Sequence, residues 1–312
     1  MLRSAFLYLA GQQRIFKFVR HNRLAKSFAN RFVAGETLDT ALAAVARLNA
    51  RGITASLDLL GESVHNEAEA LVAGEAYIAM LDRIYERKAD ANVSVKLTAM
   101  GLDISEDLCV VIMHKILQRA RDYRSFVRID MESSEYIQRT LDLFELRLYP
   151  AYRQNVGIVV QSYLYRTFAD IERAILLKAR VRLCKGAYKE PETVAYPDKK
   201  DVDATYIRGM HELMLRGNYP GIATHDEAII REAKRFAKAN DIAPDRYEFQ
   251  MLYGVRRDLQ DQLIRDGYRV RVYVPFGTQW YPYLMRRLAE RPANVAFLTG
   301  NLFKEMAGKR RR

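Results

Sequence analysis

Short apolar segments alternate with longer amphipathic stretches along most of the chain. From residue 53 onward, runs rich in β-branched residues are followed by stretches in which apolar positions recur every three or four residues, the spacing of one helix face. Each run is apolar on both faces, as in a parallel sheet covered by helices. The expected strands are 53–60, 92–98, 125–131, 156–162, 180–185, 221–225, 247–252 and 269–274.

Helical patterns fill the intervals between these runs. They lie near 64–88, 104–123, 134–147, 167–178, 201–217, 226–239 and 256–266, and a last helix follows a break at Pro275–Gly277. Eight strand–helix units with short links indicate an α/β fold, a (βα)₈ barrel, rather than an open doubly wound sheet. The first strand is not followed by a Gly-x-Gly-x-x-Gly turn, which weakens the dinucleotide-binding alternative.

The first 50 residues look helical and stand apart from this repeat. The chain lacks a Pro/Gly/Ser-rich linker, so we expect an N-terminal helical arm at 1–50 and one catalytic barrel at 51–312 with a basic C-terminal tail. The arm would contain an amphipathic stripe (Phe6, Leu9, Ile15, Phe18, Val19) and a second helix at 38–48.

Composition narrows the class of protein. An apolar content of 49% over 312 residues supports a large core, and no apolar run reaches the roughly 18 residues of a membrane span. The N-terminus lacks a signal-peptide pattern, so a cytoplasmic protein is expected. Cys109 and Cys184 give no disulfide framework, and the five histidines show no metal-ligand spacing, so no metal site is expected.

The net charge of +12 is concentrated partly at the two ends of the chain. Basic clusters occupy 14–23 and 309–312, and the first has aromatic residues between its charges. Such segments suit an anionic membrane surface as well as nucleic acid. Composition leaves both partners open.

The ends of the expected strands are unusually polar. In a (βα)₈ barrel the active site is built at that face. Taken singly, each side chain has an ordinary explanation as a structural ion-pair partner or a cap. The polar side chains at or near these ends are Lys96, Asp130, Gln161, Arg182, Lys185, Thr224, His225 and Tyr273.

The last helix adds two adjacent arginines. Tyr283, Arg286, Arg287 and Glu290 share one face, whereas Trp280, Leu284 and Leu288 form an apolar stripe on another. Two guanidiniums beside a carboxylate make a clamp for a small acid. With Lys96, Arg182 and Lys185, five cations face only Asp130 and Glu290, which favours a ligand with phosphates and a carboxylate. A site rich in cations and poor in nucleophiles is typical of cofactor chemistry.

The motifs at these strand ends resemble proline dehydrogenase, most closely the bacterial monofunctional form and the corresponding domain of the bifunctional PutA proteins. The resemblance runs in order from about residue 53 to 297. The motifs are Asp58-Leu-Leu, Val95-Lys-Leu-Thr, Ile129-Asp-Met-Glu, Gln161-Ser-Tyr, Arg182-Leu-Cys-Lys-Gly-Ala-Tyr188, Ala223-Thr-His-Asp226, Phe249-Gln-Met-Leu252-Tyr-Gly and Tyr283-Leu-x-Arg-Arg-x-x-Glu290.

The resemblance implies a distorted (βα)₈ barrel whose last helix covers the mouth, with non-covalent FAD. The implied reaction is oxidation of L-proline to Δ1-pyrroline-5-carboxylate, with electrons passed to a membrane quinone. The product would go to a separate pyrroline-5-carboxylate dehydrogenase. Peripheral contact with the anionic inner face of the cell membrane is expected, and nucleic-acid binding is not.

The resemblance also implies residue roles. Arg286, Arg287 and Lys96 would hold the proline carboxylate, Glu290 would orient an arginine, and Asp130 would anchor Arg287 or the lysine. The remaining implied roles place Tyr273, Tyr283 and Leu252 around the ring, Arg182 at flavin N5, Met131 and Gln161 near the isoalloxazine, and Lys185, Gly186, Ala187, Thr224 and His225 at the ribityl–pyrophosphate portion. Arg291 departs from the Asn that relatives often carry after the glutamate of the motif, and Lys189 stands where some bifunctional relatives have Trp.

Two other classes of protein remain as alternatives. One is a barrel enzyme that acts on another small amino or phosphorylated acid, and a colourless protein that takes up no FAD would favour it. The other is a nucleic-acid binder, which salt-dependent binding unaffected by changes at Arg286 and Arg287 would favour.

Overall fold

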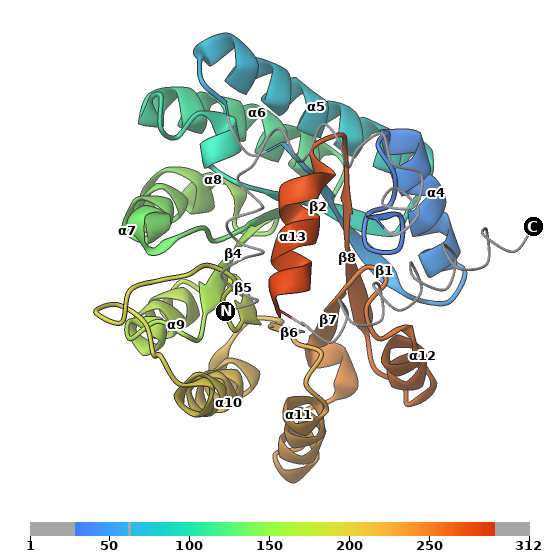
Figure 1. Ribbon diagram of the computed structural model, residues 1–312, viewed down its shortest axis with the longest axis vertical. Coiled ribbons are helices and arrows are strands. Elements are labelled where there is room, and N and C mark those ends of the chain that lie inside the picture. Colours follow the sequence, from blue (N-terminus) through green and yellow to red (C-terminus); the bar gives the residue numbers. More distant parts are fainter. Residues whose placement is uncertain (1–28, 62–63, 291–312) are drawn as a thin grey trace, which may run out of the picture.

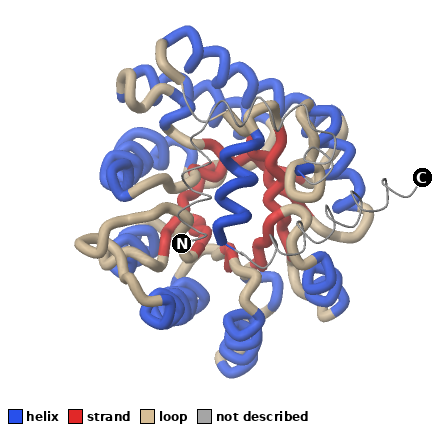
Figure 2. Tube along the Cα trace, in the orientation of Figure 1, coloured by secondary structure: helices blue, strands red, loops and turns tan. Residues whose placement is uncertain are grey.

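Eight parallel strands form a closed barrel. The computed structural model describes residues 29–61 and 64–290, without the side chains of Arg286, Leu288, Ala289 and Glu290. The strands, red in Figure 2, lie at the centre of the molecule with helices around them. Neighbours in the barrel follow chain order, and β8 pairs with β1 to close it. The strands are β1 (Thr54–Leu59), β2 (Ala91–Val95), β3 (Val127–Ile129), β4 (Val156–Gln161), β5 (Arg180–Cys184), β6 (Gly221–Ala223), β7 (Glu248–Leu252) and β8 (Val270–Phe276).

Helices surround the strands, and the last one lies across the mouth of the barrel (Figure 1). All eight expected strands are present, so the (βα)₈ prediction is confirmed. The α-helices are α4 (Leu38–Asn49), α5 (Glu67–Glu86), α6 (Glu106–Asp122), α7 (Ser134–Asp142), α8 (Tyr149–Tyr152), α9 (Thr167–Leu176), α10 (Lys199–Arg216), α11 (Glu227–Ala239), α12 (Arg257–Arg265) and α13 (Trp280–Glu290). Short helical turns are η1 (Thr98–Met100), η2 (Leu143–Leu148) and η3 (Pro244–Arg246).

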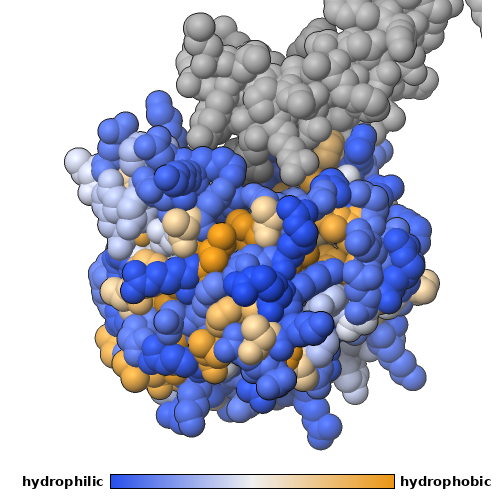
Figure 3. All heavy atoms as spheres, turned by 90° about the horizontal axis from the view of Figure 1, so that it is seen from below, coloured by the Kyte–Doolittle hydropathy of each residue, from blue (hydrophilic) through white to orange (hydrophobic). Residues whose placement is uncertain are grey.

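The outer helices bury one apolar stripe each and leave a polar face to solvent. In α11 the buried residues Ile229, Ile230, Ala233 and Ala237 recur at helical spacing, and Asp226 caps the first turn by accepting from the Ala228 N–H. The face of the molecule in Figure 3 is accordingly mostly hydrophilic, with hydrophobic side chains in small patches. None of the helices within the described ranges combines the length and the apolar character needed to cross a membrane.

Helix α4 belongs to the wall of the barrel. It packs against β1 and β8, and Ala41, Leu42, Val45 and Leu48 are buried in the same core as the strands. In Figure 1 it lies in the outer ring between α5 and α12, the place of an eighth barrel helix. Because α4 fills that place, α13 is available to cover the mouth. The 38–48 helix is therefore part of the barrel wall, whereas the stripe that includes Phe6 lies outside the described residues.

One helix expected as a single element, 134–147, is divided. Helix α7 ends at Asp142, the chain widens into the π-helical turn η2, and α8 follows. Pro150 lies in the first turn of α8. Proline lacks an N–H and its ring clashes with the carbonyl four residues earlier, so a regular helix could not run through this position without a local change.

Strand β8 runs two residues further than expected and includes Pro275. Tyr273 is the last residue of β8 paired with β7, and beyond it β8 pairs only with β1. The Tyr273 carbonyl points to β7, where it accepts from the Tyr253 N–H, so the nitrogen of Pro275, two residues on, also faces that side. No ladder partner is needed there, which is why proline is tolerated. The Pro275 carbonyl accepts from the Ala34 N–H at 2.8 Å.

Candidate active site at the mouth of the barrel

The carboxyl ends of the strands surround one cavity of about 870 Å³. Every expected site residue whose side chain is described lines this cavity. They are Lys96, Asp130, Met131, Gln161, Arg182, Lys185, Gly186, Ala187, Thr224, His225, Leu252, Tyr273, Tyr283 and Arg287. Arg286 and Glu290 lie on α13, and their side chains are outside the described residues.

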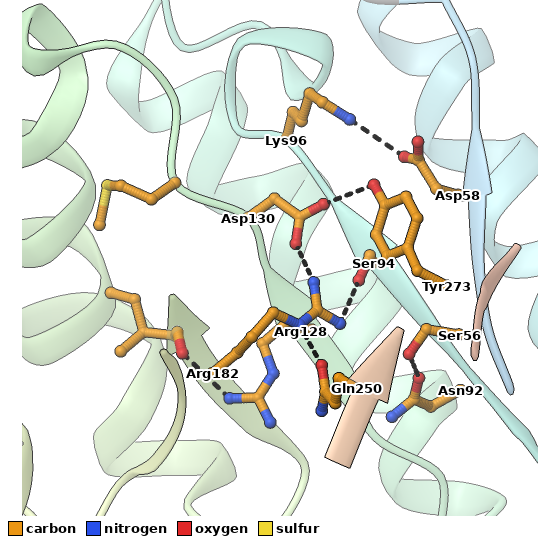
Figure 4. A network of polar contacts seen from close by, with 12 residues as sticks. Ser56, Asp58, Asn92, Ser94, Lys96, Arg128, Asp130, Arg182, Gln250 and Tyr273 are labelled. Carbon is orange, nitrogen blue, oxygen red and sulfur yellow. Dashed lines mark hydrogen bonds and ion pairs between the residues drawn. The ribbon is translucent and has the colours of Figure 1, made fainter. Parts of the chain in front are cut away.

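Arg182 is a buried cation of the site that is bonded through its Nε and both Nη atoms. It is 7% exposed, and its Nε, Nη1 and Nη2 atoms bond to residues of β7, of the segment directly after β3 and of β2 (Figure 4). Nη1 donates to Asp130 Oδ1 at 2.6 Å, Nη2 donates to Ser94 Oγ at 3.1 Å, and Nε donates to Gln250 Oε1. A planar guanidinium bonded on every side cannot rotate without breaking several hydrogen bonds, so its charge is fixed in place.

Asp130 has a different partner from the one expected. Its carboxylate accepts from Arg182 and, through Oδ2, from the Tyr273 hydroxyl at 2.8 Å, rather than anchoring Lys96 or Arg287 (Figure 4). Burial and the adjacent charge of Asp130 both raise the pKa of Tyr273 well above its ordinary value. The phenol therefore stays protonated and remains a donor to Asp130.

Lys96 is paired with Asp58, a residue that was not expected in the site. Lys96 Nζ lies 3.1 Å from Asp58 Oδ1, and Asp58 is 1% exposed. Burial raises the pKa of Asp58, while the charge of Lys96 acts in the opposite direction. The signal in the sequence was its position: Asp58 lies two residues after Ser56, so both point to the same face of β1, the interior of the barrel.

Lys185 and the loop after β5 form the other end of the cavity. Lys185 Nζ lies 2.6 Å from Asp203 and 3.0 Å from Asp226. Burial raises the pKa values of both carboxyls, but the bonds and charge of Lys185 outweigh it and the pKa values are lowered. His225 Nε2 accepts from the Leu252 N–H at 3.0 Å, which places the ring at the cavity wall as an acceptor on that nitrogen.

Gly186 has a backbone conformation that favours glycine. Its φ is +114°, and a Cβ there would lie 2.4 Å from the ring of Tyr163. The Tyr163 hydroxyl in turn donates to Glu190 at 3.2 Å. The loop therefore packs its backbone on an aromatic ring at the point where it lines the cavity.

Helix α13 closes the cavity from above. Arg287 lies over the Tyr283 ring, 5.3 Å from its centroid, and both line the cavity. Trp280 and Leu284 are buried against Ala29 to Val33 and Leu60, which confirms the apolar role expected for these two residues. Trp280 Nε1 also donates to Glu36 at 3.3 Å. The segment before α4 thus holds α13 over the strand ends.

The charge of the lining suits an anionic ligand. Seven cationic residues and four carboxylates line the cavity, so its lining has a net positive charge. The cations beyond the expected set are Lys199, Arg231 and Arg256. Within the described ranges, no group of three or more His, Cys, Asp or Glu side chains could hold a metal ion.

Comparisons with known proteins agree on one family. The model of the family described as proline dehydrogenase matches residues 41–300. Proline dehydrogenase 1 of Bacillus subtilis subsp. natto is 42% identical over 98% of this chain and 100% of its own length. Proline dehydrogenase of Deinococcus radiodurans is 41% identical over 97% of this chain and 98% of its own length.

A solved structure shares the architecture. Proline utilization A from Bdellovibrio bacteriovorus, inactivated by N-propargylglycine, superposes with a TM-score of 0.81 at 27% identity. The match covers 89% of this chain and 34% of that chain, so the present chain corresponds to about a third of that larger protein.

Proposed function

The chain belongs to the proline dehydrogenase family, and we propose that it oxidises L-proline to Δ1-pyrroline-5-carboxylate with non-covalent FAD and passes the electrons to a quinone. Full-length similarity to proteins named proline dehydrogenase supports the substrate and the oxidation. The single structural observation that carries the proposal is the cavity of about 870 Å³, in which the strand ends, the loop after β5 and α13 meet.

The lining fits FAD in size and in chemistry. A volume of about 870 Å³ is within the usual range for cofactor sites, roughly 300–1,000 Å³. Lys185, Arg231 and Arg256 would offer charge to the phosphates, and Gly186 would let the backbone come close to them. Met131 and Gln161 would lie along the ring system. Bound FAD would supply the two-electron acceptor.

Charge at the mouth would bind and orient the amino acid. Arg287 and Lys96 line the same cavity and would hold the carboxylate together with Arg286, whose neighbour Glu290 would orient a guanidinium. Tyr273, Tyr283 and Leu252 would surround the ring. Because α13 covers the mouth, the charged contacts would act where water is scarce, and orientation and fixed charge would supply most of the rate.

The product and the electrons would leave to other partners. Pyrroline-5-carboxylate would pass to a separate pyrroline-5-carboxylate dehydrogenase. The basic segments at 14–23 and 309–312, which lie outside the described residues, would provide peripheral contact with an anionic membrane that carries the quinone.

The proposal is tested by the visible spectrum of the purified protein. We expect a flavin spectrum, directly or after incubation with FAD, that is bleached by L-proline under anaerobic conditions and restored by a soluble quinone. Release of FAD by acid precipitation would show that the cofactor is non-covalent. A protein that takes up no flavin, or a flavoprotein that L-proline leaves oxidised, would contradict the proposal.

A further inference from the structure

A chain of buried polar groups continues from the site into the barrel interior. Arg182 bonds to Gln250 of β7, whose Nε2 donates to Glu248 Oε1 at 2.6 Å. Glu248 also accepts from Arg271 Nε at 2.8 Å. Gln250 is 5% exposed and Glu248 4% exposed. Barrel interiors are usually filled by branched apolar side chains, so these polar groups require an explanation.

The orientation of the Gln250 amide is determined by its two neighbours. Arg182 Nε can only donate, so it must face the amide oxygen. An ionised Glu248 can only accept, so it must face the amide nitrogen. Burial opposes ionisation of Glu248, but the charge of Arg271 and its hydrogen bonds outweigh burial and lower its pKa. Glu248 is therefore ionised at neutral pH, and a flipped amide would place donor against donor and acceptor against acceptor.

The network leaves little room for another arrangement. A Cβ at Gly221 would lie 2.4 Å from Gln250 Nε2, so glycine on β6 makes the space that the amide occupies. Arg271 is tied to β1 as well, because its Nη1 donates to the Ala55 carbonyl at 2.8 Å. Contacts that involve β1, β6, β7 and β8 thus fix the position of Gln250 together. Gln250 in turn bonds to Arg182 of β5 and limits where that side chain can lie.

We propose that Gln250 is a positioning residue for Arg182, and that Glu248 fixes the amide of Gln250 so that its oxygen faces Arg182 Nε. The inference rests on the proposed function and on the place at flavin N5 that the resemblance to the family implies for Arg182. Gln250 lines the cavity, but it bonds to Arg182 and Glu248 rather than to Lys96 or Arg287 of the proposed clamp. Its removal should therefore act on the step that depends on the charge of Arg182 and leave the binding of proline nearly unchanged.

The first test compares two interior amides. Gln250→Met keeps the length of the side chain and removes the acceptor for Arg182. Asn92→Leu is the matched control, because Asn92 is 9% exposed in the same interior and bonds to Ser56 rather than to Arg182. We expect Gln250→Met to lower kcat at least tenfold with KM for proline within about twofold. We also expect a tenfold lower equilibrium constant for flavin reduction, a fall of about 30 mV for a two-electron couple.

Two results would overturn the inference. One is a folded, flavin-loaded Gln250→Met enzyme with unchanged kcat and unchanged potential. The other is an equal change in Asn92→Leu, because that would be a general effect of altering a buried amide. A change in Gln250→Met alone supports the positioning role.

The second test observes Arg182 directly and does not depend on flavin. In protein with ¹⁵N-labelled arginine, the Nε–H of Arg182, identified by its loss in Arg182→Lys, should exchange slowly with solvent because it is buried and bonded. Gln250→Met should accelerate that exchange. Gln250→Glu alone would set two carboxylates against each other, so it is combined with Glu248→Gln, which returns an amide donor to the contact. This exchanged pair has the same shape and keeps an acceptor oxygen for Arg182, so it should preserve the protection.

The exchanged pair, Gln250→Glu with Glu248→Gln, also decides the case in which Gln250→Met fails to fold. Protection of Arg182 Nε–H retained in the exchanged pair supports the inference, and loss of protection in a folded protein with the exchanged pair overturns it. A wild-type protein that took up no flavin, or was not reduced by L-proline, would contradict the proposed function. The exchange measurement would still test the contact between Gln250 and Arg182.

Discussion

Arg287 and Tyr283 show how a helix can present charge to a covered cavity. The guanidinium lies over the phenol ring, one helical turn away, and both side chains line the space below α13. An arginine supported on an aromatic face keeps its fork of donors directed at one place. A carboxylate bound there would be recognised by geometry as well as by charge.

We therefore expect Arg287→Met and Arg286→Met each to raise KM for proline strongly. Removing one partner of a desolvated charge pair costs about 2–5 kcal/mol, which is roughly 30-fold or more in affinity. Steady-state kinetics with L-proline and a quinone would measure the change. Arg216→Met is the control, because Arg216 pairs with Glu172 on the outer surface and its KM should match wild type. Near-normal kinetics in both mouth variants would disprove the clamp.

The individual site residues could largely be found from the sequence, whereas their partners could not. The polar residues followed from their positions at strand ends, which a barrel brings to one face, whereas Met131, Ala187 and Leu252 followed only from the resemblance to the family. Pairing depends on side-chain direction and on distances across the barrel. Asp130 bonds to Arg182 and Tyr273. Lys96 bonds to Asp58, which lies two positions before the expected end of the first strand. The spacing of the residues along the sequence does not distinguish these pairs from the expected pairs.

At the scale of elements, the loop after β5 is held by close packing at a glycine. Gly186 combines a φ of +114° with direct contact between its backbone and the Tyr163 ring. The same loop pairs with the turn that follows β4 through a bridge between Leu164 and Ala195. A side chain at residue 186 would have to displace the Tyr163 ring or the loop. The loop lines the cavity, and the ring supports the loop.

We expect Gly186→Ala to weaken FAD binding at least tenfold, measured by fluorescence titration of the flavin-free protein. Gly267→Ala is the matched control: its φ is +83°, but a Cβ there meets nothing within 4 Å. Both variants carry backbone strain of roughly 1–2 kcal/mol, and only the first adds a steric clash. Equal FAD affinities in the two variants would show that the contact with Tyr163 is unimportant for the cofactor.

Periodicity predicted the elements well and their ends less well. The eight strands and the helices between them follow from apolar runs that the barrel buries on both faces. Three strands end two or three residues earlier than expected: β2 at Val95, β3 at Ile129 and β6 at Ala223. Two further exceptions are at prolines: Pro150 accompanies the π-helical turn η2, and Pro275 is accommodated in β8 because β7 has already ended. Both outcomes depend on neighbouring chain segments, which local pattern does not contain.

At the scale of the whole molecule, α4 replaces the helix that would otherwise stand beside β8. Its buried face shares the core of β1 and β8, and the residues just before it pack on α13. One stretch of chain therefore completes the barrel wall and holds the cover of the active site. The sequence indicated a helix at this place but not its partner, because the contact joins residues more than 200 positions apart.

This arrangement predicts that α4 and the barrel unfold together. Leu42 is 4% exposed in the common core, so Leu42→Ala should lower the free energy of unfolding by about 2–5 kcal/mol. Val72→Ala, which shortens a side chain that is 71% exposed on α5, should change the free energy of unfolding by no more than about 0.5 kcal/mol.

Urea unfolding would be followed by circular dichroism for the helices and by fluorescence of Trp280, the one tryptophan of the chain, for α13. If α4 were part of an independent arm, Leu42→Ala would leave the main transition in place. We expect both signals to move together to lower urea, because loss of the wall also loosens the helix that covers the site.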